Sequence, residues 1–235
     1  MGTLDGHVAL ITGGTGALGR VVSAAFLAAG ARVIVTYLVD AELPGFDAAV
    51  PKERRETAKV ELTSRADVEA LVARIVATHG RVDVLLNLAG GFAPGTIVET
   101  DDRELDQLFA MNVKTAFVCT RAALPAMIRQ QRGRIVNVTA RPALLGGAGV
   151  TAYAITKAGV AALTRAVADE VREHGVTVNA IAPSTIDTPA NRAAMPDVDP
   201  SRWVKPEEIA AALVFLASDT ASATSGAIVP IYACA

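Results

Sequence analysis

The stretch HVALITGGTGALGRVVSAAFLAAGARVIVTY, residues 7–37, decides the fold of this chain. A short apolar run of strand length, His7–Thr12, leads into the glycine-rich TGGTGALG, then into a helical pattern that Gly30 closes, and then into a second apolar run. Without side chains, the glycine backbone can approach a pyrophosphate, and the N–H groups at the start of the helix point at it. Strand, glycine turn, helix and strand within about 30 residues therefore predict a phosphate-binding βαβ unit.

The rest of the chain continues this alternation of strands and helices. Further strands are expected at 59–63, 82–91, 133–140, 176–183 and 226–232, and further helices at 67–79, 101–128, 151–174 and 206–218. The alternation predicts an α/β fold: a doubly wound, Rossmann-type parallel sheet of about seven strands with helices on both faces. No linker divides residues 1–235, so a single domain is expected, with a proline-rich substrate loop at about 184–205.

The charge and hydropathy of the chain restrict its partners. Its 235 residues carry a net charge of −2 and no run of Lys or Arg, so we expect no nucleic-acid partner. Apolar runs are cut by Arg20 and Arg32, well short of the ~18 residues of a membrane span, so we expect no membrane partner. No charged segment precedes the first apolar run, which indicates a strand rather than a signal peptide and a cytoplasmic location.

The cysteines and histidines show no pattern typical of a disulfide or a metal centre. Cys119 and Cys234 stand alone without CxxC spacing, which fits a reducing compartment. His7, His79 and His174 are scattered along the chain and lack metal-ligand spacing, so no metal is expected.

Tyr153 and Lys157 are the pair of residues that most strongly indicates chemistry. They are four residues apart on a predicted helix and share one face, which brings the ammonium within roughly 5–6 Å of the phenol. A neighbouring positive charge lowers a phenol pKa that is about 10 when unperturbed, so Tyr153 is expected to donate a proton near neutral pH. The glycine turn and the strand ends NLAGG, VTA and APST are expected beside this pair, at the carboxyl edge where such sheets bind ligands.

Five motifs make the chain resemble the short-chain dehydrogenase/reductase family over essentially its whole length. They are TGGTGALG, NLAG (Asn87–Gly90), Asn112, YAITK (Tyr153–Lys157) and the VNAIAP stretch before Thr188, in the order and spacing of the family. The resemblance implies that Tyr153 donates a proton to the substrate and that Lys157 lowers the Tyr153 pKa and holds the nicotinamide ribose. It implies that Asn112 supports a water that relays protons, and that the substrate is a small molecule.

The same resemblance implies NAD or NADP as the cofactor and places it against several segments of the chain. The expected contacts are Gly13, Thr15, Gly16, Ala17, Leu18, Gly19, Tyr37, Glu61, Leu62, Asn87, Ala89, Gly90, Tyr153, Lys157, Pro183, Ile186 and Thr188. Tyr37 stands where NAD-preferring members have Asp, and no Arg occupies the position that would accommodate a 2′-phosphate. The choice between NAD and NADP therefore stays open.

The chain departs from the family pattern at Ala140, where a Ser thirteen residues before the Tyr usually bonds the substrate carbonyl. Thr139 precedes it, but successive side chains on a strand point to opposite faces. With Ala17 in the glycine turn and the segment TIDTPANRAAMPDVDPSRW, this departure resembles the dihydropteridine reductases, which implies reduction of a quinonoid dihydropterin by a reduced nicotinamide. The expected substrate contacts are Thr139, Ala140, Arg141 and Trp203, the last of which either lines the pocket or packs the loop.

Two other functions remain open at this point. Asn112, NLAG and VNAIAP resemble the carbonyl-reducing members more closely, including the 3-oxoacyl-[acyl-carrier-protein] reductases. Ala140 by itself would also fit a non-catalytic dinucleotide-binding sensor. The resemblance further implies a homo-dimer or homo-tetramer, formed through the long helices Glu104–Met127 and Tyr153–Glu173.

Overall fold

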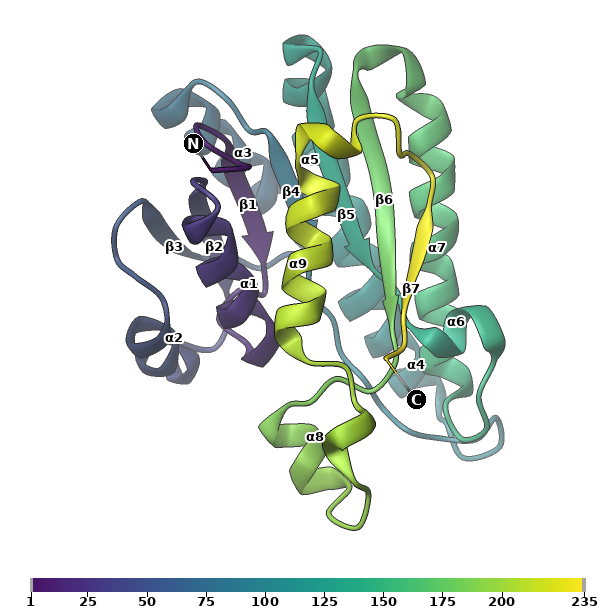
Figure 1. Cartoon of the computed structure of the whole chain (residues 1–235). Helices are drawn as coiled ribbons and strands as arrows, with labels where there is room; N and C mark the ends of the chain where they lie inside the picture. Colours follow the sequence, from purple (N-terminus) through teal and green to yellow (C-terminus); the bar gives the residue numbers. More distant parts are fainter. Residues whose placement is uncertain (1, 234–235) are drawn as a thin grey trace.

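The computed structural model describes residues 2–233, which form a parallel sheet flanked by helices (Figure 1). The sheet has seven strands in the order β3-β2-β1-β4-β5-β6-β7, and every neighbouring pair is parallel. The strands are β1 (Val8–Thr12), β2 (Arg32–Tyr37), β3 (Arg55–Lys59), β4 (Val84–Asn87), β5 (Gly133–Val138), β6 (Val176–Pro183) and β7 (Ile228–Ile231). The predicted doubly wound, Rossmann-type sheet is confirmed. Cys234 lies outside the described residues, and Cys119 is a buried free thiol.

Helices cover both faces of the sheet, as parallel strands require. In Figure 1, α1 and α9 lie in front of the sheet, and α3, α5 and α7 lie behind it. The α-helices of residues 2–233 are α1 (Ala17–Ala28), α2 (Leu43–Ala49), α3 (Arg65–His79), α4 (Asp102–Phe109), α5 (Thr115–Gln130), α6 (Arg141–Leu145), α7 (Thr151–Glu170), α8 (Pro189–Ala194) and α9 (Pro206–Ala217). None of the helices in this part of the chain is long and apolar enough to cross a membrane.

Two hydrophobic cores follow from strands that are apolar on both faces. Along β1, Val8 and Leu10 pack against the side of α3 and α5, whereas Ala9 and Ile11 pack against α1 and α9. Because side chains alternate along a strand, an unbroken apolar run serves both cores at once.

Local capping signals set the ends of α3. The Ser64 hydroxyl accepts a hydrogen bond from the Asp67 N–H at 3.4 Å, and Gly80 ends the helix with φ +76°, a backbone conformation that glycine adopts without strain. The predicted helix at 67–79 is therefore confirmed, and it begins two residues earlier than expected.

The third strand lies four residues earlier than the sequence predicts. It covers Arg55–Lys59 instead of 59–63, and it pairs with β2 from Val33 opposite Arg55 to Tyr37 opposite Lys59. β3 is an edge strand, and Ala58 is its only buried side chain, so a polar sequence suffices there. The apolar letters that suggested a strand at 59–63 include Leu62, which is buried in the turn after β3.

The long helix expected from Asp101 is interrupted by a π-helical segment, Ala110–Lys114 (η2), between α4 and α5. Asn112 lies in this segment and is 1% exposed. Wider π turns are typical of functional sites because they re-aim a side chain without ending the helix. The remaining short elements are the 3-10 turns η1 (Asp40–Glu42), η3 (Arg172–His174), η4 (Pro200–Arg202) and η5 (Asp219–Ala221).

Candidate active site

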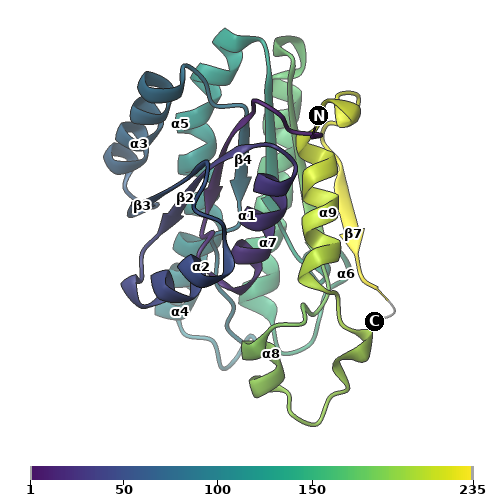
Figure 2. The same ribbon diagram turned by 60° about the vertical axis from the view of Figure 1, so that its left-hand side comes forward.

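The carboxyl ends of the strands lie at one edge of the sheet, where α4, α6 and α8 also lie (Figures 1 and 2). The glycine turn follows β1 at this edge, the segment Leu88–Gly91 follows β4, and Thr139 and Ala140 follow β5. α7 begins close by at Thr151 and carries Tyr153 on its first turn. The predicted pieces of the site are therefore at the same edge of the sheet.

Asn112 is hydrogen-bonded to the loop after β4, and Lys157 lies close to the same loop. The Asn112 side chain accepts from Gly91 N at 2.9 Å and donates to Gly91 O at 3.1 Å and to Thr156 Oγ1 at 3.0 Å. Lys157 Nζ donates to Val138 O at 3.0 Å. A Cβ on Gly90 would lie 2.6 Å from Asn112 Oδ1 and 3.2 Å from Lys157 Nζ, so only glycine lets this loop approach both groups.

Tyr153 contacts both Lys157 and Phe92. Lys157 Nζ lies 5.9 Å from the centre of the Tyr153 ring, and the Phe92 ring packs edge-on against Tyr153 with 5.0 Å between the ring centres. Phe92 is 61% exposed, which leaves an open apolar surface beside the phenol.

Burial disfavours the charged forms of both Tyr153 and Lys157 and shifts their pKa values accordingly. It raises the pKa of Tyr153 to about 12 and lowers the pKa of Lys157 to about 8. The direction for Tyr153 is opposite to the one expected from sequence. Within residues 2–233 no hydrogen bond joins the two side chains, so the loss of hydration outweighs the attraction of the ammonium.

The end of β5 presents no hydroxyl to the site. Thr139 Oγ1 donates to Lys157 O at 2.6 Å and is buried against α7, so its expected substrate contact stays a prediction that this placement does not favour. Ala140 is 4% exposed and precedes α6. The Arg141 guanidinium lies over the Tyr232 ring at 5.5 Å, close to the end of the described chain.

A cleft of about 310 Å³ lies between the ends of β1, β2 and β4. Six of the expected cofactor contacts line it, namely Gly13, Tyr37, Glu61, Leu62, Ala89 and Gly90. The sequence reasoning missed Thr36, Leu38, Val60, Thr63, Met111 and Thr115, which also line it. Met111 and Thr115 come from the π segment and α5, and no local pattern relates them to the glycine turn.

The glycine turn fits a dinucleotide because side chains are excluded from it. A Cβ on Gly13, which has φ +62°, would lie 2.9 Å from Ala89 Cα, and a Cβ on Gly19 would lie 2.5 Å from Gly13 O. Gly16 caps the start of α1 beside this turn, and Ala17 and Leu18 are the first residues of the helix, whose N–H groups can meet a pyrophosphate.

Asn87 does not line the cleft. Its amide nitrogen donates to Asn137 Oδ1 at 2.7 Å and to Thr120 Oγ1 at 3.2 Å, and the residue is 4% exposed. The side chain therefore ties β4 to β5 and α5 in the core. The expected cofactor contact of Asn87 stays a prediction, which this placement of its side chain does not favour.

The segment 184–205 is closed on itself by its own contacts. Val204 N donates to Thr185 O at 2.9 Å and Asp187 N donates to Val204 O at 2.8 Å, which joins its two ends. Further contacts within it include Asn191 Nδ2 to Ile186 O at 2.8 Å, Asn191 N to Thr188 Oγ1 at 3.2 Å, and Arg192 to both oxygens of Asp187 at 2.6 and 2.8 Å. Several side chains of the TIDTPANR sequence therefore make contacts that hold the segment in its own fold. Trp203, at 6% exposed, is buried at its end, and Pro183 is the buried last residue of β6.

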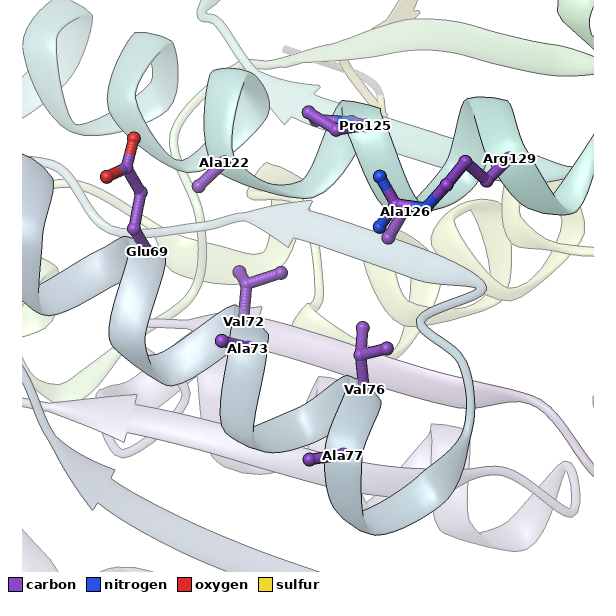
Figure 3. A pocket seen from close by; sticks show the side chains of 9 residues that line it. All are labelled: Glu69, Val72, Ala73, Val76, Ala77, Ala122, Pro125, Ala126 and Arg129. Carbon is purple, nitrogen blue, oxygen red and sulfur yellow. The ribbon is translucent and has the colours of Figure 1, made fainter.

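A second groove, of about 400 Å³, lies between α3 and α5 (Figure 3). Val72 and Val76 of α3 face Ala122 and Ala126 of α5 across it. It holds none of the expected catalytic or cofactor residues, and it lies on helices behind the sheet instead of at the carboxyl edge. We regard it as a gap between helices that meet through small side chains.

Comparison with known proteins identifies the family. Residues 7–199 match the short chain dehydrogenase model, and the chain therefore belongs to the short-chain dehydrogenase/reductase family. It is an oxidoreductase that depends on NAD or NADP, as its sequence implied.

Individual relatives extend along almost the whole chain. It is 34% identical over 241 residues to the 3-oxoacyl-[acyl-carrier-protein] reductase FabG of Thermotoga maritima, with 97% of each chain covered. It is 33% identical over 244 residues to the (2S)-[(R)-hydroxy(phenyl)methyl]succinyl-CoA dehydrogenase subunit BbsD of Thauera aromatica, which covers 98% of this chain and 96% of the relative. The solved structure of levodione reductase matches with a TM-score of 0.90 at 29% identity, covering 98% of this chain and 97% of the other.

Proposed function

We propose that this protein reduces a conjugated cyclic substrate of the quinonoid dihydropterin type, with NADH or NADPH as the hydride donor. The carrying observation is the absence of a hydroxyl at the end of β5. Ala140 offers only a methyl group, and the Thr139 hydroxyl is bound to Lys157 O. A simple ketone needs a donor to hold its oxygen, whereas a conjugated ring spreads the developing charge over several atoms.

The residues of the site are suited to supplying the proton. The nicotinamide, when bound, supplies the hydride. Burial keeps Tyr153 protonated, with a pKa of about 12, so the phenol holds its proton until the substrate takes it. Lys157, with a pKa of about 8, is mostly charged at pH 7 and stabilises the phenolate that forms. Asn112 positions the loop after β4, through Gly91, against this pair.

The test is a parallel screen with NADH and NADPH. Oxidation of the reduced nucleotide should occur with quinonoid dihydropterin and should fall by about three orders of magnitude in Tyr153→Phe, as expected when a general acid is lost. The dissociation constant of the nucleotide should change little in this variant. Undiminished turnover in Tyr153→Phe would rule out the assigned role, and absence of turnover with the pterin would rule out the substrate.

A 3-oxoacyl or other carbonyl reductase is the second candidate, favoured by the 34% identity to the Thermotoga maritima reductase. In this case Ala140→Ser should restore a donor to the substrate oxygen and raise kcat/KM on simple ketones. No gain on ketones would count against this candidate. Saturable nucleotide binding without turnover on any carbonyl or pterin substrate would instead favour a non-catalytic sensor.

Assembly into a homo-dimer or homo-tetramer, in the cytoplasm, completes the proposal. Phe109 and Phe117 are 39% and 47% exposed along α4 and α5, and Ile155 is 47% exposed on α7. Ala158 and Ala162 are also exposed on α7, which leaves room for a close approach of another helix.

We further propose that residues 1–235 act as one domain with 184–205 as the substrate loop, because α8 lies beyond the carboxyl ends of the strands (Figure 2).

A further inference from the structure

Glu42 reaches from the segment after β2 to the glycine turn. It is the last residue of the 3-10 turn Asp40–Glu42, and its carboxylate accepts a hydrogen bond from the Thr15 hydroxyl, 27 residues earlier in the chain. Thr15 is fully buried and Glu42 is partly exposed. A carboxylate thus lies at the junction of the glycine turn and the end of β2.

This junction is where the ribose of the adenosine half must pass. The pyrophosphate is expected at the start of α1, and the adenosine in the cleft lined by Gly13, Tyr37 and Leu38. The ribose that joins them would then lie between the glycine turn and the end of β2. In dinucleotide sites of this kind an acid binds the ribose hydroxyls, and a basic residue accommodates a 2′-phosphate. Tyr37 cannot supply the acid, and Glu42 is the carboxylate that contacts the turn.

Two cations near this junction, Lys59 and Arg20, already have partners. Lys59 Nζ lies 2.5 Å from Asp40 Oδ2, and Arg20 Nε donates to Thr15 O at 2.7 Å. The Arg20 guanidinium also packs against Gly45 of α2. Neither cation is therefore free to neutralise a 2′-phosphate without losing its present partner.

We propose that Glu42 is the specificity-determining acid of the cofactor site, that it binds the ribose hydroxyls of NAD(H), and that it disfavours NADP(H) by charge repulsion. The inference rests on the nucleotide site of the proposed function. It does not depend on the identity of the reduced substrate.

The alternative role of Glu42 is purely structural: a hydrogen bond that connects the 3-10 turn to the glycine turn. The variant Glu42→Gln distinguishes this structural role from binding of the ribose. The amide keeps the size of the side chain and an oxygen that accepts from Thr15, but it removes the charge. Glu53→Gln is the matched control, because Glu53 is an exposed acid in the segment after α2 and its removal changes the net charge equally.

The experiment is isothermal titration of NADH and NADPH into the full chain at pH 7.5 and low salt. We expect wild type to bind NADH at least tenfold more tightly than NADPH. Glu42→Gln should narrow that ratio by about tenfold, mainly through tighter NADPH binding, as a unit charge about 5 Å from the nearly doubly charged 2′-phosphate in a water-like medium would give. Glu53→Gln should leave the ratio within about twofold, because that charge is not placed beside the ribose.

Three results would overturn the inference. Equal or tighter binding of NADPH by wild type would refute the preference while leaving the proposed function intact. An unchanged ratio in Glu42→Gln would show that Glu42 is only a fastening residue. Binding of neither nucleotide by wild type would overturn both this inference and the proposed function.

Discussion

Replacing Lys157 by Met should stabilise the folded protein and inactivate it. Burial lowers the pKa of Lys157 from 10.5 to about 8, a difference of about 2.5 units, so holding the charge at pH 7 costs the folded state about 3 kcal/mol. The lost hydrogen bond to Val138 O offsets about 1–2 kcal/mol of that gain. Lys157→Met should therefore increase the free energy of unfolding at pH 7 by about 1–2 kcal/mol.

The pH dependence follows from the direction of the shift. Because the folded-state pKa is lower than the unfolded one, the unfolded chain binds more protons between pH 8 and 10.5, and wild-type stability rises with pH in this window. Between pH 7 and 9.5 the rise attributable to Lys157 is about 2 kcal/mol, and it should be absent from Lys157→Met. The Tyr153 phenol does not contribute below pH 10, because its pKa is raised to about 12.

The assay is urea unfolding of wild type and Lys157→Met at pH 7, 8.5 and 9.5, with Lys52→Met as the control for an exposed lysine. The difference between wild type and Lys157→Met should shrink as the pH rises, and Lys52→Met should follow wild type throughout. A less stable Lys157→Met at pH 7, or a difference that is independent of pH, would refute the reasoning that the ammonium is costly to bury.

Three further predictions test other parts of the structure. Gly90→Ala places a Cβ 2.6 Å from Asn112 Oδ1, so kcat should fall by about tenfold to a hundredfold in steady-state assays; full activity would show that the loop can move away. Arg192→Gln breaks an exposed ion pair with Asp187 in the proposed substrate loop, so the free energy of unfolding should change by less than about 1 kcal/mol while KM rises; an unchanged KM would separate the loop from substrate binding. Phe117→Glu puts a charge on the exposed face of α5, so sedimentation velocity should show monomers where wild type shows dimers or tetramers, and an unaltered oligomer would exclude this face.

The glycine turn and the Tyr153–Lys157 pair could be identified from sequence because both depend on local spacing. The alternation of apolar runs with helical periods likewise predicts the parallel sheet, since buried strands and amphipathic helices have different periods. β3 was placed four residues too late because an edge strand with one buried side chain has no such period. The π segment at Asn112 could not be foreseen either, because its residues have no composition that separates them from an ordinary helix.

The sequence by itself determined the family, the order of the elements and the pairing of Tyr153 with Lys157, because these depend on residues close together along the chain. Only the tertiary structure decided where individual side chains point. It turns Asn87 and Thr139 into the core, through contacts with Asn137 and Lys157, and it brings Glu42 to Thr15. The pKa of Tyr153 also depends on the tertiary structure, because burial is set by every residue packed around the phenol. The effect of this burial outweighs the single neighbouring charge that helical spacing could predict.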